Sequence, residues 1–332
     1  VVLVDEASMV DTADADAIRQ HVQAAGARWI WAGDHRQLGA VGAGGMMADL
    51  AGTATTYELA QVHRMNAEWE RAASLRLRDG DLAVLADYER HGRLRACPSL
   101  AHAEADAARA WLADTLAGVP AAVVVATNDQ AARLATQCRN DLIALGRIAP
   151  DGVHLARQST MAGVGDVVVT RTNHRRLADV TGRRAEVWNR DRWTITEIRP
   201  DGALIVTPAG QDDARQVVLP ADYVATSVEL GYATTEYGVQ GQTITRNYVV
   251  RPPGGSPQAL YVDLTRSTEY TIVYVPTRPD GEIADGQTHT TPHRSAAAIL
   301  AETLTREPDP ADQAGAAHAD DQAAYHASAR TL

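Results

Sequence analysis

The first four residues, VVLV, form an unbroken run of aliphatic side chains that ends in Asp5 and Glu6. Such a run predicts a strand that is buried on both faces of a parallel sheet. Open α/β sheets bind their ligands at the carboxyl ends of the strands, where these two acids would lie. The pattern therefore favours an α/β fold with metal-assisted chemistry at this edge. The alternative is a strand that ends in two acids by chance.

The same design, a buried strand followed by a helix, recurs along the chain. Residues 28–32 form a second apolar strand, which ends at Gly33-Asp34, and residues 122–126 form a third, which runs into an amphipathic helix. Alternation of this kind is typical of α/β folds. We predict a first lobe with its connector at 1–118 and a second lobe made of 119–163 and 228–304.

Between residues 164 and 227 the hydrophobic period falls to two, in short runs separated by turn residues. This pattern predicts a small antiparallel β-barrel inserted into the second lobe. Residues 305–332 are rich in alanine and aspartate and poor in large apolar side chains, which predicts a disordered tail.

The formal net charge of the 332 residues is −11, so binding to nucleic acid would need a local basic patch. Residues 166–199 supply one, with eight arginines against five acids. Arginines that follow phosphates, beside aromatic side chains on which bases stack, are typical of single-strand binding. The residues of this hypothesis are Arg183, Arg184, Trp188 and Trp193. The alternative is that both tryptophans fill the barrel core and the arginines form a solvated rim.

The chain contains no lysine, so all 31 of its basic residues are arginine. A phosphate loop of the form G-x-x-x-x-G-K-[ST] needs a lysine that reaches the nucleotide phosphates. The glycine-rich segment 39–45 therefore cannot serve as one, and we expect this chain to be a fragment that lacks its phosphate loop. Two cysteines without metal spacing fit a reducing cytoplasm. No run approaches the roughly 20 apolar residues of a membrane helix.

Four further polar residues follow strands or apolar runs: Gln37 in "AGDHRQLGAV", Arg64 in "ELAQVHRM", Gln240 in "TTEYGVQGQT" and Arg266 in "YVDLTRSTEY". Each has an ordinary explanation of its own, such as a polar turn or a solvated surface. As an ordered set with "DEAS", they resemble superfamily 1 helicases of the RecD-like group, and especially the helicase half of conjugative relaxases. The resemblance covers residues 1–275.

The resemblance implies two RecA-like parallel-sheet lobes, the first incomplete, with an inserted SH3-like barrel. It also implies a motor that uses ATP and magnesium and acts on single-stranded DNA, with a possible relaxase domain upstream in the same polypeptide. Two rival hypotheses remain open. The chain could be a DNA-binding module that does not hydrolyse ATP, or an inactive gene remnant.

The resemblance also implies roles for single residues. Asp5 would hold the magnesium and the nucleotide, Glu6 would polarise the attacking water, and Gln37 would sense the γ-phosphate. Arg64 and Arg266 would be arginine fingers, which stabilise the charge of the transferred phosphoryl group. Residues that would couple the nucleotide to DNA or contact its phosphates are Gln240, Gly241, Thr235, Thr127 and Asn128.

Overall fold

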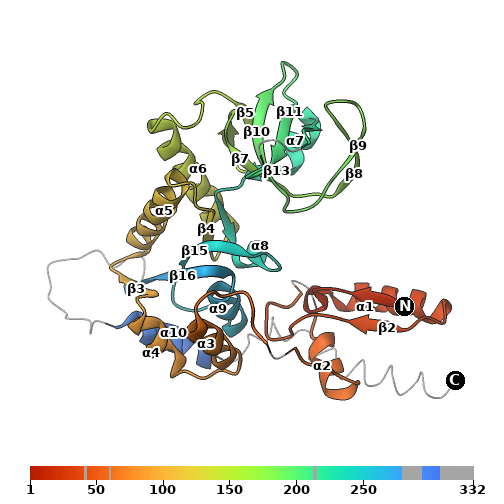
Figure 1. The fold of residues 1–332 in the computed structure, drawn as a ribbon, viewed down its shortest axis with the longest axis vertical. Coiled ribbons are helices and arrows are strands. Elements are labelled where there is room, and N and C mark those ends of the chain that lie inside the picture. Colours follow the sequence, from red (N-terminus) through yellow and green to blue (C-terminus); the bar gives the residue numbers. More distant parts are fainter. Residues whose placement is uncertain (41–42, 60, 212–214, 279–293, 307–332) are drawn as a thin grey trace.

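The computed structural model describes residues 1–40, 43–59, 61–211, 215–278 and 294–306. It contains a two-stranded parallel sheet near the N-terminus, a five-stranded parallel sheet and a seven-stranded antiparallel sheet. In Figure 1 the antiparallel sheet lies above the five-stranded one, and the N-terminal sheet lies at the lower right. The predicted α/β class is confirmed. No helix of the described residues is long and apolar enough to cross a membrane.

The N-terminal part is built on β1 (Val2–Val4) and β2 (Trp29–Trp31), which pair in parallel with Leu3 opposite Ile30. The 3₁₀ turn η1 (Ala7–Met9) and helix α1 (Thr12–Ala24) connect the two strands, and α2 (Met46–Thr53) follows them. The side chains of Leu3 and Ile30 are 63% and 43% exposed. The prediction of a first strand buried on both faces is therefore wrong, because one face of this sheet stays open.

The five-stranded sheet has the order β14–β4–β15–β16–β3, and all of its pairs are parallel. Its central strands are buried on both faces. Val123 and Val125 of β4 pack into one apolar cluster with α5 and α6, whereas Val124 packs into a second cluster with α3, α4, α9 and α10. The elements are β3 (Leu94–Cys97), β4 (Ala121–Val125), β14 (Ala233–Thr235), β15 (Ile244–Val250), β16 (Ser267–Pro276), α3 (Glu68–Arg78), α4 (Val84–Arg90), α5 (Leu100–Leu116), α6 (Asn128–Ala144), α8 (Glu236–Val239), α9 (Pro257–Leu264) and α10 (Ala296–Thr305).

The predicted boundary between 118 and 119 does not match this topology. Strand β3 pairs with β16, with Leu94 opposite Val273, and α5 packs on the same sheet. Residues 94–116 therefore belong to the second lobe. The strand escaped prediction because "LRAC" has no apolar run, and only its pairing with β16, far along the chain, makes it a strand. The predicted tail begins at 305, where α10 ends, and its residues 307–332 lie outside the described ones.

The predicted insertion at 164–227 is an antiparallel sheet of order β13–β7–β10–β11–β12–β8–β9. Its end strands, β9 and β13, do not pair with each other in the part of the chain that the structure describes. The sheet also takes in residues 228–230, beyond the predicted boundary. The elements of this region are β5 (Val153–Leu155), β6 (Thr160–Ala162), β7 (Val167–Thr170), β8 (His174–Asp179), β9 (Arg184–Val187), β10 (Arg192–Ile198), β11 (Leu204–Pro208), β12 (Val217–Leu219), α7 (Ala221–Ser227) and β13 (Val228–Leu230).

A buried polar network fastens the antiparallel sheet to the five-stranded one. Arg139 of α6 donates from Nε to Asp166 Oδ2 at 2.7 Å, and the Tyr232 hydroxyl donates to Asp166 Oδ1 at 2.6 Å. Arg139 Nη2 also donates to the carbonyl oxygens of Ala149 and Pro150. Because a buried charge must find partners, this network fixes how the two sheets meet.

Candidate functional site

Residues that are far apart in the sequence meet where the N-terminal part contacts the five-stranded sheet. Gln37 follows β2, and Arg266 lies between α9 and β16. Arg266 Nη2 donates to Gln37 Oε1 at 3.2 Å, although 229 residues separate them. Arg64 Nη1 donates to the carbonyl oxygen of Thr265 at 2.7 Å. Three of the predicted catalytic side chains thus share one site.

The amide of Gln37 is oriented by its own loop. Asp34 accepts a hydrogen bond from Gln37 Nε2 at 3.2 Å, and its other carboxylate oxygen accepts from the backbone N–H of Arg36 at 2.9 Å. With its nitrogen held in this way, Gln37 turns its oxygen toward Arg266. Tyr261 lies beside this loop, and burial together with the Asp34 carboxylate raises the pKa of Tyr261 to about 12. The sequence analysis missed Tyr261, whose only signal was its place five residues before Arg266.

The two arginines form a cationic pair at this interface. Arg266 is 2% exposed, and its Nε has no hydrogen-bond partner. Burial and, after it, the charge of Arg64 lower the pKa of Arg266 to about 10, while the Glu6 carboxylate opposes this change. Burial likewise lowers the pKa of Arg64. The buried guanidinium of Arg266 and the half-buried guanidinium of Arg64 repel each other, and an anion between them would relieve this repulsion.

Glu6 faces the turn that follows α8. Its φ of +48° is in the left-handed region, which a non-glycine residue adopts only when its surroundings impose it. Gly241 has a φ of +78°, which favours glycine, and a Cβ added there would lie 3.4 Å from Glu6 Oε1, so the two residues are neighbours. The neighbouring Gln240 is buried and donates from Nε2 to the carbonyl oxygen of Leu38 at 3.2 Å. The turn at Gln240-Gly241 therefore contacts the loop after β1 and the loop after β2.

The acids at the end of β1 fit only one mode of metal binding. Among residues 1–40, 43–59, 61–211, 215–278 and 294–306, no three His, Cys, Asp or Glu side chains cluster as a metal site. Asp5 is exposed, and one of its oxygens accepts from the backbone N–H of Glu6 at 2.9 Å. Magnesium in nucleotide sites is held by one or two carboxylates and completes its shell with phosphate oxygens and water. The single Asp5 carboxylate fits that mode.

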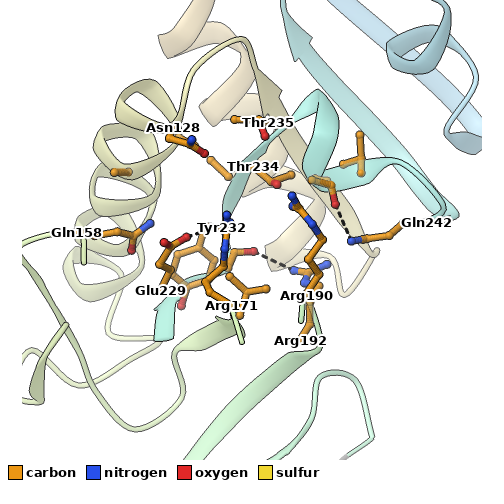
Figure 2. A pocket seen from close by; sticks show the side chains of 18 of the residues that line it. Asn128, Gln158, Arg171, Arg190, Arg192, Glu229, Tyr232, Thr234, Thr235 and Gln242 are labelled. Carbon is orange, nitrogen blue, oxygen red and sulfur yellow. Dashed lines mark hydrogen bonds and ion pairs between the residues drawn. The ribbon is translucent and has the colours of Figure 1, made fainter. Parts of the chain in front are cut away.

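A second polar site lies between the five-stranded sheet and the antiparallel sheet (Figure 2). Asn128 at the start of α6 and Thr235 at the end of β14 line one side of this cavity, as the resemblance implied for two DNA contacts. Thr127, the third, instead caps α6 through a reciprocal pair of hydrogen bonds with Gln130. The opposite side carries the arginines Arg171, Arg190 and Arg192. The sequence analysis counted these three in the basic stretch but did not select them.

The predicted aromatic and basic contacts of the insertion do not come together in this cavity. Trp193 is 6% exposed and belongs to the apolar core, so the prediction that it stacks on bases is wrong. Trp188 is 40% exposed, and the Arg175 guanidinium lies 5.3 Å from its ring centre. Arg183 and Arg184 are exposed near the turn between β8 and β9, where Arg184 is paired with Glu186 at 2.8 Å.

Comparison with known proteins gives similarity over most of the chain. The model of the AAA domain family matches residues 1–99. A probable conjugal transfer protein TraA of Sinorhizobium fredii is 24% identical over 276 residues, which are 82% of this chain and 24% of that protein. Conjugal transfer protein TraA of Rhizobium radiobacter is 25% identical over 282 residues, 84% of this chain and 24% of that protein. This chain thus spans about a quarter of the length of these relatives.

The fold is similar to that of solved helicases. The Pif1 helicase from Bacteroides in complex with ADP-AlF3 and ssDNA aligns with a TM-score of 0.53 at 13% identity, over 98% of this chain and 75% of that one. The Pif1 helicase from Candida albicans aligns with a TM-score of 0.52 at 16% identity, over 83% of this chain and 71% of that one. The chain is thus similar in sequence to conjugal transfer proteins and similar in fold to Pif1 helicases.

Proposed function

We propose that this chain is part of an ATP-driven motor that translocates on single-stranded DNA in the cytoplasm during conjugative plasmid transfer. The observation that carries the proposal is the 3.2 Å contact between Arg266 and Gln37, with Arg64 fixed beside it on Thr265. Two arginines, an oriented glutamine and a glutamate at one interface are the groups that phosphoryl transfer requires. The similarity in sequence to conjugal transfer proteins motivates the biological setting.

Each side chain has a task in this proposal. The carboxylate of Glu6 orients the attacking water, and Gln37 contacts that water or the γ-phosphate through its amide. Arg64 and Arg266 stabilise the charge that develops on the transferred group, which contributes about 10³ to 10⁵ in rate for such arginines. Asp5 would hold magnesium, which neutralises charge on the phosphate oxygens when it is bound.

The lack of lysine limits what the chain can do alone. Because none of its 332 residues is lysine, the phosphate-gripping lysine must come from polypeptide outside this sequence. We therefore propose a fragment that needs that segment for hydrolysis. The same observation favours the second candidate, a DNA-binding module that does not hydrolyse ATP. The two differ only in whether ATP turnover appears once a phosphate loop is supplied.

We also propose which residues contact the DNA. Pif1 structures with ssDNA motivate a DNA track, and Asn128 and Thr235 offer polar side chains for phosphate contact. We retain the SH3-like classification of the insertion and a relaxase domain upstream as proposals. Proposed contacts outside the cavity are Thr127, Arg183, Arg184 and Trp188.

The test joins this chain to a segment that carries a phosphate loop and compares three versions of the product. We expect single-stranded DNA to stimulate ATP turnover of the unaltered protein, and Arg266→Ala to lower turnover by about 10³-fold or more with little change in nucleotide affinity. Arg109→Ala is the control, because the Arg109 side chain is 74% exposed on α5. Equal losses of binding and turnover in Arg266→Ala would assign that arginine a structural role.

A further inference from the structure

The cavity of Figure 2 has one wall with an excess of positive charge. Four arginines line it, against the two acids Asp129 and Glu229. Glu229 is already engaged, since Arg157 Nε lies 2.8 Å from its Oε1 and Arg171 Nη1 lies 3.2 Å from its Oε2. Arg190 and Arg192 form no ion pair within the described ranges. Arg192 Nη2 donates only to the carbonyl oxygen of Gly231, at 3.2 Å.

Arg190 is presented by a rigid turn between β9 and β10. Its φ of +74° is unusual for a residue with a side chain. The backbone N–H of Arg190 donates to the carbonyl oxygen of Thr170 at 2.6 Å. Asp191 Oδ2 accepts from the backbone N–H of Trp188 at 2.7 Å, and the Thr170 hydroxyl donates to the carbonyl oxygen of Trp188, also at 2.7 Å. The surrounding turn thus maintains a strained backbone that aims one guanidinium into the cavity.

The facing helix α8 leaves room for that guanidinium. At Gly238, an added Cβ would collide with Thr234 Oγ1 and lie 2.7 Å from Arg190 Nη1. Glycine at this position therefore lets Arg190 reach across from the antiparallel sheet to the threonines of β14. Figure 2 shows Arg190 directed toward Thr234, with Gln242 on the same side. Two sheets distant in sequence thereby enclose one cationic group.

Arg190 is half-buried, and both burial and the neighbouring charge of Arg171 lower its pKa, with Glu229 opposing them. A partly desolvated guanidinium without an acid partner is stabilised by an anion. The cavity volume is about 190 Å³, below the roughly 300–1,000 Å³ of sites for small organic ligands. A phosphate-sized group therefore suits it better than a whole nucleotide does.

We propose that this cavity binds a phosphodiester group of single-stranded DNA, with Arg190 as its principal cationic ligand and Arg192 as a second. The hydroxyl groups of Thr234 and Thr235 and the amide of Asn128 complete the polar wall opposite the arginines. The inference rests on the proposed function, because it takes DNA as the source of the phosphate. It assigns the main contact to the β9–β10 turn rather than to Arg183 and Arg184.

The test is a fluorescence-anisotropy titration of labelled oligothymidylate with the 332-residue chain at several salt concentrations. Arg190→Gly removes the guanidinium and suits the positive φ, so the fold should persist. We expect affinity to fall about tenfold or more, as for loss of a charged hydrogen bond. The slope of log K against log salt should become shallower by about 0.7, the value for one phosphate contact to a single strand.

Arg147→Gly is the matched control. Arg147 is exposed in the loop after α6, about 25 Å along the helix axis from Asn128, and its loss changes the net charge equally. If the unaltered chain binds DNA and both variants bind like it, with unchanged slopes, our inference is overturned while the proposed function stands. If the unaltered chain does not bind DNA at low salt, the DNA part of the proposed function falls as well.

A second variant and a competition experiment complete the test. If thermal unfolding shows that Arg190→Gly is destabilised, Arg192→Gln replaces it, because Arg192 is exposed and its substitution should weaken binding without unfolding the sheet. An unchanged affinity in that variant would overturn the proposal. Inorganic pyrophosphate, added at constant ionic strength, should displace the oligonucleotide only at millimolar concentration. Displacement at micromolar concentration would show that the cavity takes free anions instead.

Discussion

Glu70 on α3 is a carboxylic acid in the core beside the five-stranded sheet. It is fully buried, and neither of its carboxyl oxygens has a hydrogen-bond partner. The hydroxyl of Tyr88 is also buried without a partner, and Arg93 and His91 provide the nearest positive charges. Burial raises the pKa of Glu70 to about 7, with those two charges opposing the rise. We predict that Glu70 makes the stability of the chain depend on pH.

The sign follows from the direction of the pKa change. In the unfolded chain Glu70 loses its proton near 4.5, and in the folded chain near 7. Between these values the folded state binds more protons, so the free energy of unfolding falls as pH rises. At about 1.4 kcal/mol for each tenfold change in proton affinity, the total loss is about 3 kcal/mol. It is absent below pH 4.5 and complete above pH 7.

Glu70→Gln removes the titrating proton and keeps the shape of the side chain. We expect the free energy of unfolding of this variant, measured in urea, to fall less between pH 5 and pH 8 than that of the unaltered chain, by most of the roughly 3 kcal/mol assigned to Glu70. Glu68→Gln is the control, because Glu68 is exposed on the same helix, two residues away. A variant that keeps the full pH dependence of the unaltered chain would refute the account of Glu70.

Three further predictions follow from the site and the core. The 332-residue chain alone should show no DNA-stimulated ATP turnover above background, and turnover that disappears in Glu6→Gln would contradict this. Arg251→Met should destabilise the fold by about 3–5 kcal/mol in urea unfolding, because it leaves the buried Asp263 carboxylate, 3.1 Å from Arg251, without its partner. Trp193→Ala should cost about 3–5 kcal/mol through a core cavity. Its affinity for DNA under folding conditions should stay that of the unaltered chain, and a loss of affinity in the folded variant would argue for a direct stacking contact.

Gln37 could be predicted because its loop directly follows a strand, and loops after parallel strands gather at one edge of a sheet. Arg266 does not fit that argument, because it follows the helix α9 and precedes β16, so its contact with Gln37 depends on the tertiary fold. Trp193 could also have been placed correctly. It alternates with Ile195 along "RWTITEI", and both are buried, whereas Trp188 lies in a turn. The basic composition of the stretch outweighed this period of two.

Other features depend on contacts that no local pattern contains. Eight arginines of the stretch 166–199 look equivalent in the sequence, and only the fold separates them. Arg190 differs because its turn holds a positive φ and because Gly238, in the facing helix α8, leaves space for its guanidinium. Burial of Glu70 is equally tertiary, since nothing in "EWERAASLRLR" distinguishes it from the exposed Glu68 on the same helix.

The four-residue helix α8 connects the two sites. Its preceding residue Thr235 lines the arginine cavity, and the turn after it, Gln240-Gly241, contacts Leu38 and Glu6. The first residue of the helix, Glu236, lies 3.3 Å from Arg251, which also holds Asp263 on α9.

A ligand that displaces α8 from the cavity side must therefore move the turn against Glu6 or separate a buried ion pair. Separation would leave the half-buried Glu236 carboxylate without its partner, whereas movement of the turn breaks no ion pair, so movement of the turn is the easier response. Asp263 lies three residues before Arg266 on the same segment, so the ion pair also ties the cavity side to the arginine that contacts Gln37. Because coupling between two binding equilibria is reciprocal, any factor by which DNA in the cavity changes the affinity of Arg64 and Arg266 for an anion is also the factor by which that anion changes the affinity of the cavity for DNA.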